Sequence, residues 1–130
     1  MNKIYFTADL HFGHTNILKH QPNRLFAGEN DSTKHDEWLL ELWRNTVGKK
    51  DMIYILGDLT FLKSEGARLL LEKLPGRKYM VVGNHDGSIK AYRQYFMRFE
   101  DIIDLTVKPT LCPEIPENVM LTMCHYPMVT

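Results

Sequence analysis

The chain has 130 residues, 44% of them hydrophobic and 25% charged, which is the size and composition of one soluble globular domain. Sixteen basic side chains balance sixteen acidic ones, so nothing in the charge supports nucleic acid as a partner. The spacing of the two cysteines, Cys112 and Cys124, is far from a CxxC motif, so neither a zinc ribbon nor a disulfide framework is expected. No apolar run reaches the roughly 20 residues that span a bilayer, and the N-terminus lacks a signal-peptide pattern. We therefore expect one reduced, cytoplasmic domain over residues 1–130, with no membrane partner.

Apolar strand patterns alternate with helical patterns along the first two thirds of the chain. Runs without polar alternation over 4–8, 52–56 and 79–82 predict strands buried on both faces of a sheet. Hydrophobic residues recur at helical spacing over 34–47 and 64–74, and Gly48 and Pro75-Gly76 end these helices. This alternation is typical of βαβ units and predicts an α/β fold with a mainly parallel sheet.

The last third of the chain changes character. An aromatic-rich helix is expected over roughly 89–99, followed by strands over 102–107 and 119–124. Three prolines between these strands indicate a turn, so the two strands are predicted to form an antiparallel hairpin. The polar segment 21–33 is expected to be a surface loop, either mobile or covering the substrate.

Candidate ligands follow four of the five predicted strands. Asp9 and His11 end the first strand, where the period-two geometry of a strand would direct both side chains to the same side. Asp58 follows the second strand, Asn84 follows the third, and His125 closes the last. Because α/β folds place ligands at the carboxyl ends of their strands, we expect these side chains to converge.

Carboxylate, amide and imidazole groups together suit hard or borderline divalent cations. The Asp58 carboxylate has two oxygens and can bridge two ions. Two ions held by Asp9, Asp58 and a hydroxide leave a net positive pocket, for which phosphate esters are natural ligands. Manganese is the first expectation for the metal, and iron, zinc and nickel suit the same ligand set.

These motifs also match a known family. Asp9-x-His11, Gly57-Asp58, Gly83-Asn84-His85-Asp86 and the isolated His125 resemble, in order and spacing, the calcineurin-like metallophosphoesterase superfamily. The opening Ala8-Asp9-Leu10-His11-Phe12-Gly13-His14-Thr15-Asn16 is similar to a small bacterial and phage branch of it. The resemblance implies a metallophosphoesterase-type sandwich of β-sheets flanked by helices, with two metal ions at the sheet rim.

The resemblance also implies a role for each residue of the motifs. Asp9 and His11 would hold the first ion, Asp58 would bridge both ions, and Asn84 and His125 would hold the second. His85 would act as transition-state stabiliser or general acid beside its partner Asp86. The implied reaction is hydrolysis of small phosphodiesters or phosphomonoesters by attack of metal-bound hydroxide on phosphorus.

One expected element does not follow His125. The superfamily pattern continues to a Gly-His-x-His motif with one more imidazole for each ion, yet this sequence stops at Thr130. We therefore expect an incomplete, N-terminal portion of a longer domain, or a natural short form completed by another chain. Its second metal site should be weak, and its sheet edge should be exposed and open to self-association. The alternatives are a catalytically impaired form that serves an interaction or assembly role, and a metal-dependent nuclease, which the neutral charge disfavours.

Several single residues have a second interpretation. Turn and capping chemistry explains each aspartate, asparagine or histidine of the motifs when it is taken alone. His14 and Asn16 could reach a phosphate or cap the following helix, and Arg24 could clamp a substrate phosphate or be solvated. His20 and His35 are expected on the surface. The aromatic residues at helical spacing are expected in the core: Trp38, Trp43, Tyr92, Tyr95, Phe96 and Phe99.

Overall fold

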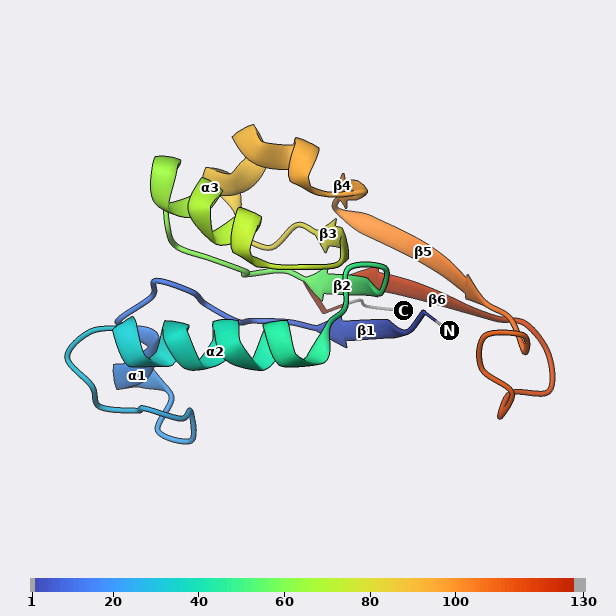
Figure 1. Cartoon of the computed structure of the whole chain (residues 1–130), viewed down its shortest axis with the longest axis horizontal. Helices are drawn as coiled ribbons and strands as arrows, with labels where there is room; N and C mark the ends of the chain where they lie inside the picture. Colours follow the sequence, from blue (N-terminus) through green and yellow to red (C-terminus); the bar gives the residue numbers. More distant parts are fainter. Residues whose placement is uncertain (1, 128–130) are drawn as a thin grey trace.

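A four-stranded parallel sheet forms the centre of the computed structural model, which describes residues 2–127 (Figure 1). The strands are β1 (Ile4–Thr7), β2 (Met52–Leu56), β3 (Arg77–Val81) and β4 (Arg98–Glu100), hydrogen-bonded in the order β1-β2-β3-β4. Every neighbouring pair is parallel. The predicted α/β fold with a parallel sheet is therefore confirmed.

Helices connect the parallel strands. They are α1 (Ile17–His20), α2 (Thr33–Thr46), α3 (Ser64–Lys73) and the 3₁₀ helix η1 (Gly87–Tyr95). The apolar spacing over 34–47 and 64–74 located α2 and α3 to within one residue at each end. The helix expected over 89–99 was wrong in type and length, because η1 is kinked at Tyr92 and the chain then pairs with β3 as β4. Strand pairing here overrides the helical spacing of the aromatic residues.

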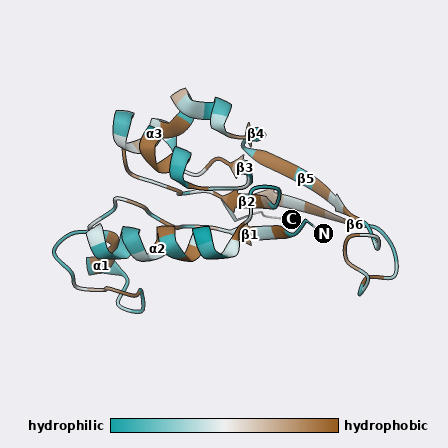
Figure 2. Cartoon of the chain, in the orientation of Figure 1, coloured by the Kyte–Doolittle hydropathy of each residue, from teal (hydrophilic) through white to brown (hydrophobic). Residues whose placement is uncertain are grey.

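The helices α2, α3 and η1 cover one face of the sheet. Strands added in one direction by crossovers of the same hand place every connecting helix on the same side. One continuous cluster of buried side chains follows, which joins α2, α3 and η1 to the sheet and includes Trp43, Ile55, Leu71 and Met80. Figure 2 shows the corresponding pattern, with hydrophobic colour along the strands and alternating colours along α2. Trp38 lies outside this core with 38% of its surface exposed, contrary to the expectation from its spacing.

A hairpin covers the opposite face. It consists of β5 (Ile102–Val107) and β6 (Val119–Cys124), which are antiparallel as predicted, with Ile102 opposite Cys124. The buried residues Tyr54, Val81, Ile103 and Met123 form a smaller cluster between the hairpin and the sheet. Because β5 starts directly after β4, β6 returns the chain to the carboxyl end of the parallel sheet. His125 follows β6 at that end.

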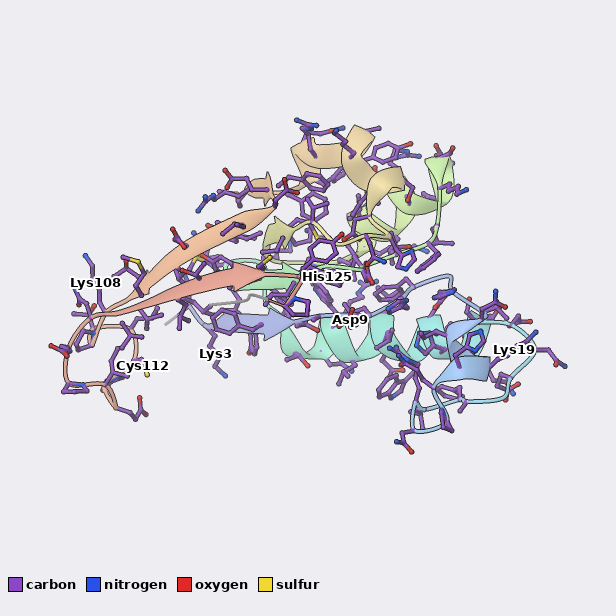
Figure 3. All side chains as sticks on the ribbon, turned by 180° about the vertical axis from the view of Figure 1, so that it is seen from behind. Lys3, Asp9, Lys19, Lys108, Cys112 and His125 are labelled. Carbon is purple, nitrogen blue, oxygen red and sulfur yellow. The ribbon has the colours of Figure 1, made fainter. Side chains whose placement is uncertain are left out.

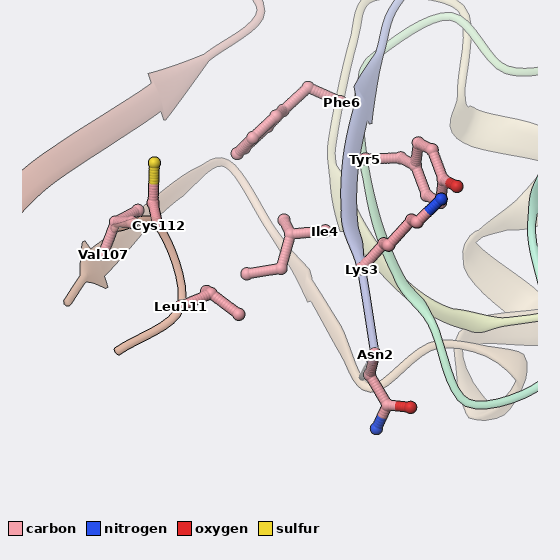
Figure 4. A pocket seen from close by; sticks show the side chains of 8 residues that line it. All are labelled: Asn2, Lys3, Ile4, Tyr5, Phe6, Val107, Leu111 and Cys112. Carbon is pink, nitrogen blue, oxygen red and sulfur yellow. The ribbon is translucent and has the colours of Figure 1, made fainter. Parts of the chain in front are cut away.

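The outer side of β1 borders an apolar recess of about 430 Å³. Figure 4 shows Ile4 and Phe6 pointing from β1 toward Leu111 and Cys112 of the β5–β6 connection, while Tyr5 points away. Among residues 2–127, β1 pairs with β2 alone, so its other edge is open. Cys112 and Cys124 are free thiols. No helix within the described range is long and apolar enough to cross a membrane.

Candidate metal centre

The loops that follow β1 and β2 run side by side and carry three of the predicted ligands. The amide of Asp9 donates to the carbonyl of Gly57 at 3.0 Å, and the amide of His11 donates to the carbonyl of Asp58 at 3.0 Å. Asp9, His11 and Asp58 all have left-handed backbones, with φ of 54°, 56° and 54°. The period-two argument for Asp9 and His11 was therefore wrong, because both residues lie beyond the end of β1 at Thr7. The paired loops bring them to Asp58.

The Asp58 carboxylate lies at the centre of the group. His11 Nε2 is 3.8 Å from Asp58 Oδ2 and 3.9 Å from Asp9 Oδ1, and His125 Nε2 is 3.5 Å from Asp58 Oδ2. Asp9, Asp58 and His125 each offer a ligand atom within 4.8 Å of the others. Figure 3 labels Asp9 and His125, which lie close together although 115 positions of sequence separate them.

Asn84 and His85 complete the ring of side chains. Asn84 Oδ1 is 3.0 Å from His125 Nε2, and the amide of Asn84 donates from Nδ2 to His85 Nε2 at 3.1 Å. The backbone amide of His85 donates to Asp58 Oδ1 at 3.1 Å. The structure therefore brings Asp9, His11, Asp58, Asn84, His85 and His125 to one place, while their roles in binding metal remain predictions.

The orientation of His125 fits a cation. Its Nδ1 lies 2.9 Å from the carbonyl oxygen of Leu56, and a carbonyl oxygen can accept but cannot donate. In a neutral ring, Nδ1 then carries the proton and the lone pair of Nε2 faces the oxygens of Asn84 and Asp58. A nitrogen lone pair and two oxygens directed at one another are satisfied by a positive ion, and a backbone acceptor on the far ring nitrogen is a common device for orienting a metal ligand.

His11 presents its ring in a similar way. Its Nδ1 lies 2.9 Å from Nδ1 of His14, which leaves Nε2 toward the carboxylates. Burial lowers the pKa of His11 to about 4, so the ring is neutral at pH 7 and can offer a lone pair. His14 stacks on Phe61 with ring centroids 3.7 Å apart. Neither interpretation of His14 from the sequence foresaw this contact with a ligand ring, and Phe61 was not singled out at all.

Two glycines leave the space that these side chains occupy. A β-carbon at Gly57 would overlap the ring of His125, and the φ of Gly57 is +89°. A β-carbon at Gly83 would lie 2.6 Å from Asp58 Oδ1 and 2.8 Å from the Asp58 amide nitrogen. Gly57 and Gly83 directly precede the predicted ligands Asp58 and Asn84. Glycine is needed at both positions because a larger residue would overlap the side chains or backbone of the site.

Asp86 lies beneath the ligands and anchors their loops. Its buried carboxylate accepts backbone hydrogen bonds from Gly83 at 2.6 Å, Asp58 at 2.8 Å and Leu59 at 3.0 Å. Burial raises the pKa of Asp86, and the three amide donors act against that rise. Within the part of the chain that the structure describes, no hydrogen bond joins this carboxylate to the His85 ring. In this structure Asp86 holds the backbone of these loops, and the role that the resemblance implies for it, as the partner of His85, stays a prediction.

Arg24 is held by backbone carbonyls in this structure, and the phosphate-binding roles expected of Asn16 and Arg24 stay predictions. Asn16 precedes α1 without a side-chain capping bond. Arg24 turns inward and donates to the carbonyls of Asp9 at 2.8 Å and Leu10 at 3.2 Å. His35, expected on the surface, is fully buried and 3.2 Å from Arg24. Its exposure was misjudged because its partner lies in the preceding loop, which the spacing of α2 does not reveal.

The comparisons with known proteins agree with this geometry. A family model described as calcineurin-like phosphoesterase matches residues 2–117, so the chain belongs to the calcineurin-like phosphoesterase family.

Two phage proteins are similar to the chain in sequence. It is 40% identical to the gene 66 protein of Mycobacterium phage D29 over 72% of this chain and 45% of that protein. It is 31% identical to the gene 66 protein of Mycobacterium phage L5 over 99% of this chain and 65% of that protein. These phage relatives fit the small phage and bacterial branch.

A crystal structure of a protein of unknown function from Aquifex aeolicus is similar with a TM-score of 0.68 and 29% identity. The match covers 98% of this chain and 62% of that one. The chain thus spans about half to two thirds of the length of the proteins it matches.

Proposed function

We propose that the protein is a metal-dependent phosphoesterase that hydrolyses small phosphodiesters or phosphomonoesters. The observation that supports this most strongly is the convergence of Asp9, Asp58 and His125, whose ligand atoms lie within 4.8 Å of one another at the carboxyl end of the parallel sheet. Membership of the calcineurin-like phosphoesterase family supports the same chemistry. A divalent cation between the carboxylates of Asp9 and Asp58 would balance their negative charge.

The donor atoms would divide between two ions. Asp9, His11 and Asp58 would hold one ion, and Asp58, Asn84 and His125 would hold the other, with manganese favoured and iron, zinc or nickel compatible. Divalent cations supply Lewis-acid polarisation of a phosphate and activation of a water molecule when they are bound. Each ion would receive three protein ligands from the described residues. We therefore expect calorimetry to show weak binding of the second manganese ion, and two tight ions per chain would contradict this.

His85 is the residue that we propose to transfer a proton. Its ring is exposed at the rim of the site, where a leaving group could reach it. Because Nε2 accepts from the Asn84 amide, a neutral His85 ring carries its proton on Nδ1. The hydrogen bond from the His85 amide to Asp58 fixes the backbone that carries the ring. The general acid would be the imidazolium form of His85, which would pass its Nε2 proton to the leaving oxygen and become the neutral ring that accepts from Asn84.

The direct test is manganese-dependent release of nitrophenol from bis-nitrophenyl phosphate. Asp58→Asn should abolish the release and manganese binding, because it removes the charge that both sets of ligands share. Asp104→Asn is the matched control, since Asp104 lies on the hairpin and bonds to Thr122. Absence of turnover with manganese, iron, zinc and nickel would overturn the proposal.

A role in assembly is the second candidate function. It is supported by the open edge of β1 and by the apolar recess beside it, where Phe6 is 49% exposed. Exposed apolar surface next to an unpaired strand edge favours pairing with another chain. Sedimentation velocity tests this candidate, and a strictly monomeric chain would make it untenable.

A further inference from the structure

We propose that Arg24, His35 and Asp36 form a positioning relay that holds the loop of Asp9 and His11 in the conformation needed to bind metal. This inference rests on the proposed function, which assigns Asp9 and His11 to a metal ion. Within the described residues, no hydrogen bond or ion pair joins the side chain of any of the three to the side chain of a predicted ligand. They are therefore positioning residues, and their effect on the site passes through the backbone of residues 9–13.

Arg24 is the part of the relay that contacts the ligand loop from one side. Nη2 donates to the carbonyl of Asp9 at 2.8 Å, and Nη1 donates to the carbonyl of Leu10 at 3.2 Å. Nε donates to Gln21 Oε1 at 3.0 Å, which fixes the plane of the guanidinium. With these bonds and the contact to His35, the guanidinium is directed at the protein and not at the rim, so a substrate phosphate would have to displace its partners.

His35 connects Arg24 to Asp36. Its Nε2 lies 3.2 Å from Arg24 Nη1, and its Nδ1 lies 3.0 Å from Asp36 Oδ1. Because a guanidinium can only donate, Nε2 must accept and the proton of the neutral ring must be on Nδ1, where it donates to Asp36. The His35 side chain is fully buried, so each of its two ring nitrogens has a protein partner in place of water.

Asp36 contacts the ligand loop from the other side. Its two carboxylate oxygens lie 3.1 and 3.0 Å from the Gly13 amide nitrogen, and Ser32 Oγ donates to Oδ2 at 3.0 Å. The relay therefore holds the loop at the carbonyls of Asp9 and Leu10 and at the amide of Gly13, and His11 lies between these points.

The loop needs such support because of its backbone. Asp9 and His11 both have positive φ, a region in which residues other than glycine are strained. Strained conformations persist where the surrounding structure imposes them. The loop after β1 is held by β2 through the Asp9 and His11 amides and by the relay through the neighbouring carbonyls and Gly13. Loss of the relay should release one of these two restraints.

The first experiment measures hydrogen exchange by NMR in protein from which metal has been removed. Arg24→Lys keeps the charge but loses the planar fork of donors. We expect the amides of Asp9, His11 and Gly13 to exchange about tenfold faster, as for a local opening, while those of β2 are unchanged. Asp36→Asn leaves one acceptor oxygen in place of two, and it should accelerate hydrogen exchange at the same amides. Arg44→Lys and Glu37→Gln on the exposed side of α2 are the matched controls.

The second experiment compares manganese affinity with the kinetic constants. Both relay variants should bind manganese about 10-fold to 100-fold more weakly, which is the usual effect of removing a group that orients a metal ligand. With saturating manganese, KM for bis-nitrophenyl phosphate should stay near that of the unaltered protein. A raised KM with unchanged manganese affinity would instead identify Arg24 as a phosphate clamp and overturn the relay.

The two proposals fail in different ways. Unchanged exchange at Asp9, His11 and Gly13 in both variants would overturn the relay, whatever the activity. If the unaltered protein binds no manganese or hydrolyses no phosphate ester, the proposed function fails, and the relay as a metal-positioning device fails with it when manganese does not bind. Accelerated exchange together with weakened manganese binding supports the relay even where no substrate is found.

Discussion

The floor and the rim of the candidate metal centre differ in burial. The floor consists of Asp58, Gly83 and Asp86, and the first and last of these are 5% and 0% exposed. The rim consists of Asp9, Asn84 and His85, and 53% of the Asp9 side chain is exposed. Adjacent residues of one motif, His85 and Asp86, thus belong to different regions. Changes in the floor should alter folding stability, and changes in the rim should alter chemistry alone.

The largest loss of stability is expected for Asp86→Ala. It leaves the buried amides of Gly83, Asp58 and Leu59 without an acceptor. Buried donors that lose a charged partner cost about 1–3 kcal/mol each, and with partial relaxation we expect a total loss of about 3–5 kcal/mol in the free energy of unfolding. Urea denaturation followed by circular dichroism measures this loss. A loss below that of a surface substitution such as Asp104→Ala would show that the floor is not held by Asp86.

Bound manganese should stabilise the folded protein, because Asp58 of the floor and Asp9 of the rim would share the ion. Manganese at a hundred times its dissociation constant should stabilise the folded protein by about 2.7 kcal/mol. Thermal unfolding with manganese and with a chelator measures this difference. Asp58→Asn is the control and should show no dependence on manganese. Identical unfolding of the unaltered protein under both conditions would contradict metal binding.

Gly57→Ala tests the boundary between the floor and the hairpin. The new methyl group would overlap the His125 ring, and the left-handed backbone of Gly57 disfavours alanine. We expect a loss of about 1–3 kcal/mol in the free energy of unfolding, from overpacking and backbone strain. Manganese binding by Asn84 and His125 should weaken as well. Gly87→Ala is the matched control, since a methyl group there meets open space. An unshifted NMR signal of the His125 ring would contradict the overlap.

The smallest effect on stability is expected for His85→Ala, which changes the rim alone. Its backbone hydrogen bond to Asp58 remains, so the free energy of unfolding should change by less than about 0.5 kcal/mol. The kcat for bis-nitrophenyl phosphate should fall about 100-fold if the ring transfers a proton. Calorimetry should show unchanged manganese affinity. His20→Ala, at an exposed position, serves as the control. Unchanged kcat would remove His85 from the proposed mechanism.

Local patterns predicted the elements of the fold well. The strands 52–56, 102–107 and 119–124 have the expected bounds, while α2 differs from its expected range by one residue at both ends and α3 by one residue at its C-terminal end. Periodicity succeeds there because each element buries a face that its own sequence defines. It failed over 89–99, where pairing of Arg98–Glu100 with β3 decides the conformation. The sheet neighbour that makes β4 a strand is distant in sequence and leaves no local pattern.

The sequence by itself determined the order of the motifs, and with it the family and the set of donor atoms that a metal ion would meet. Only the tertiary structure decided the function of each polar group within those motifs. Asp86 accepts three backbone amides, Arg24 and His35 turn inward toward the ligand loop, and Asp9 and His11 meet through paired loops and not through strand alternation. The reason is physical: a residue type limits which bonds a side chain can make, but burial and the partners that folding brings near select which of them it makes.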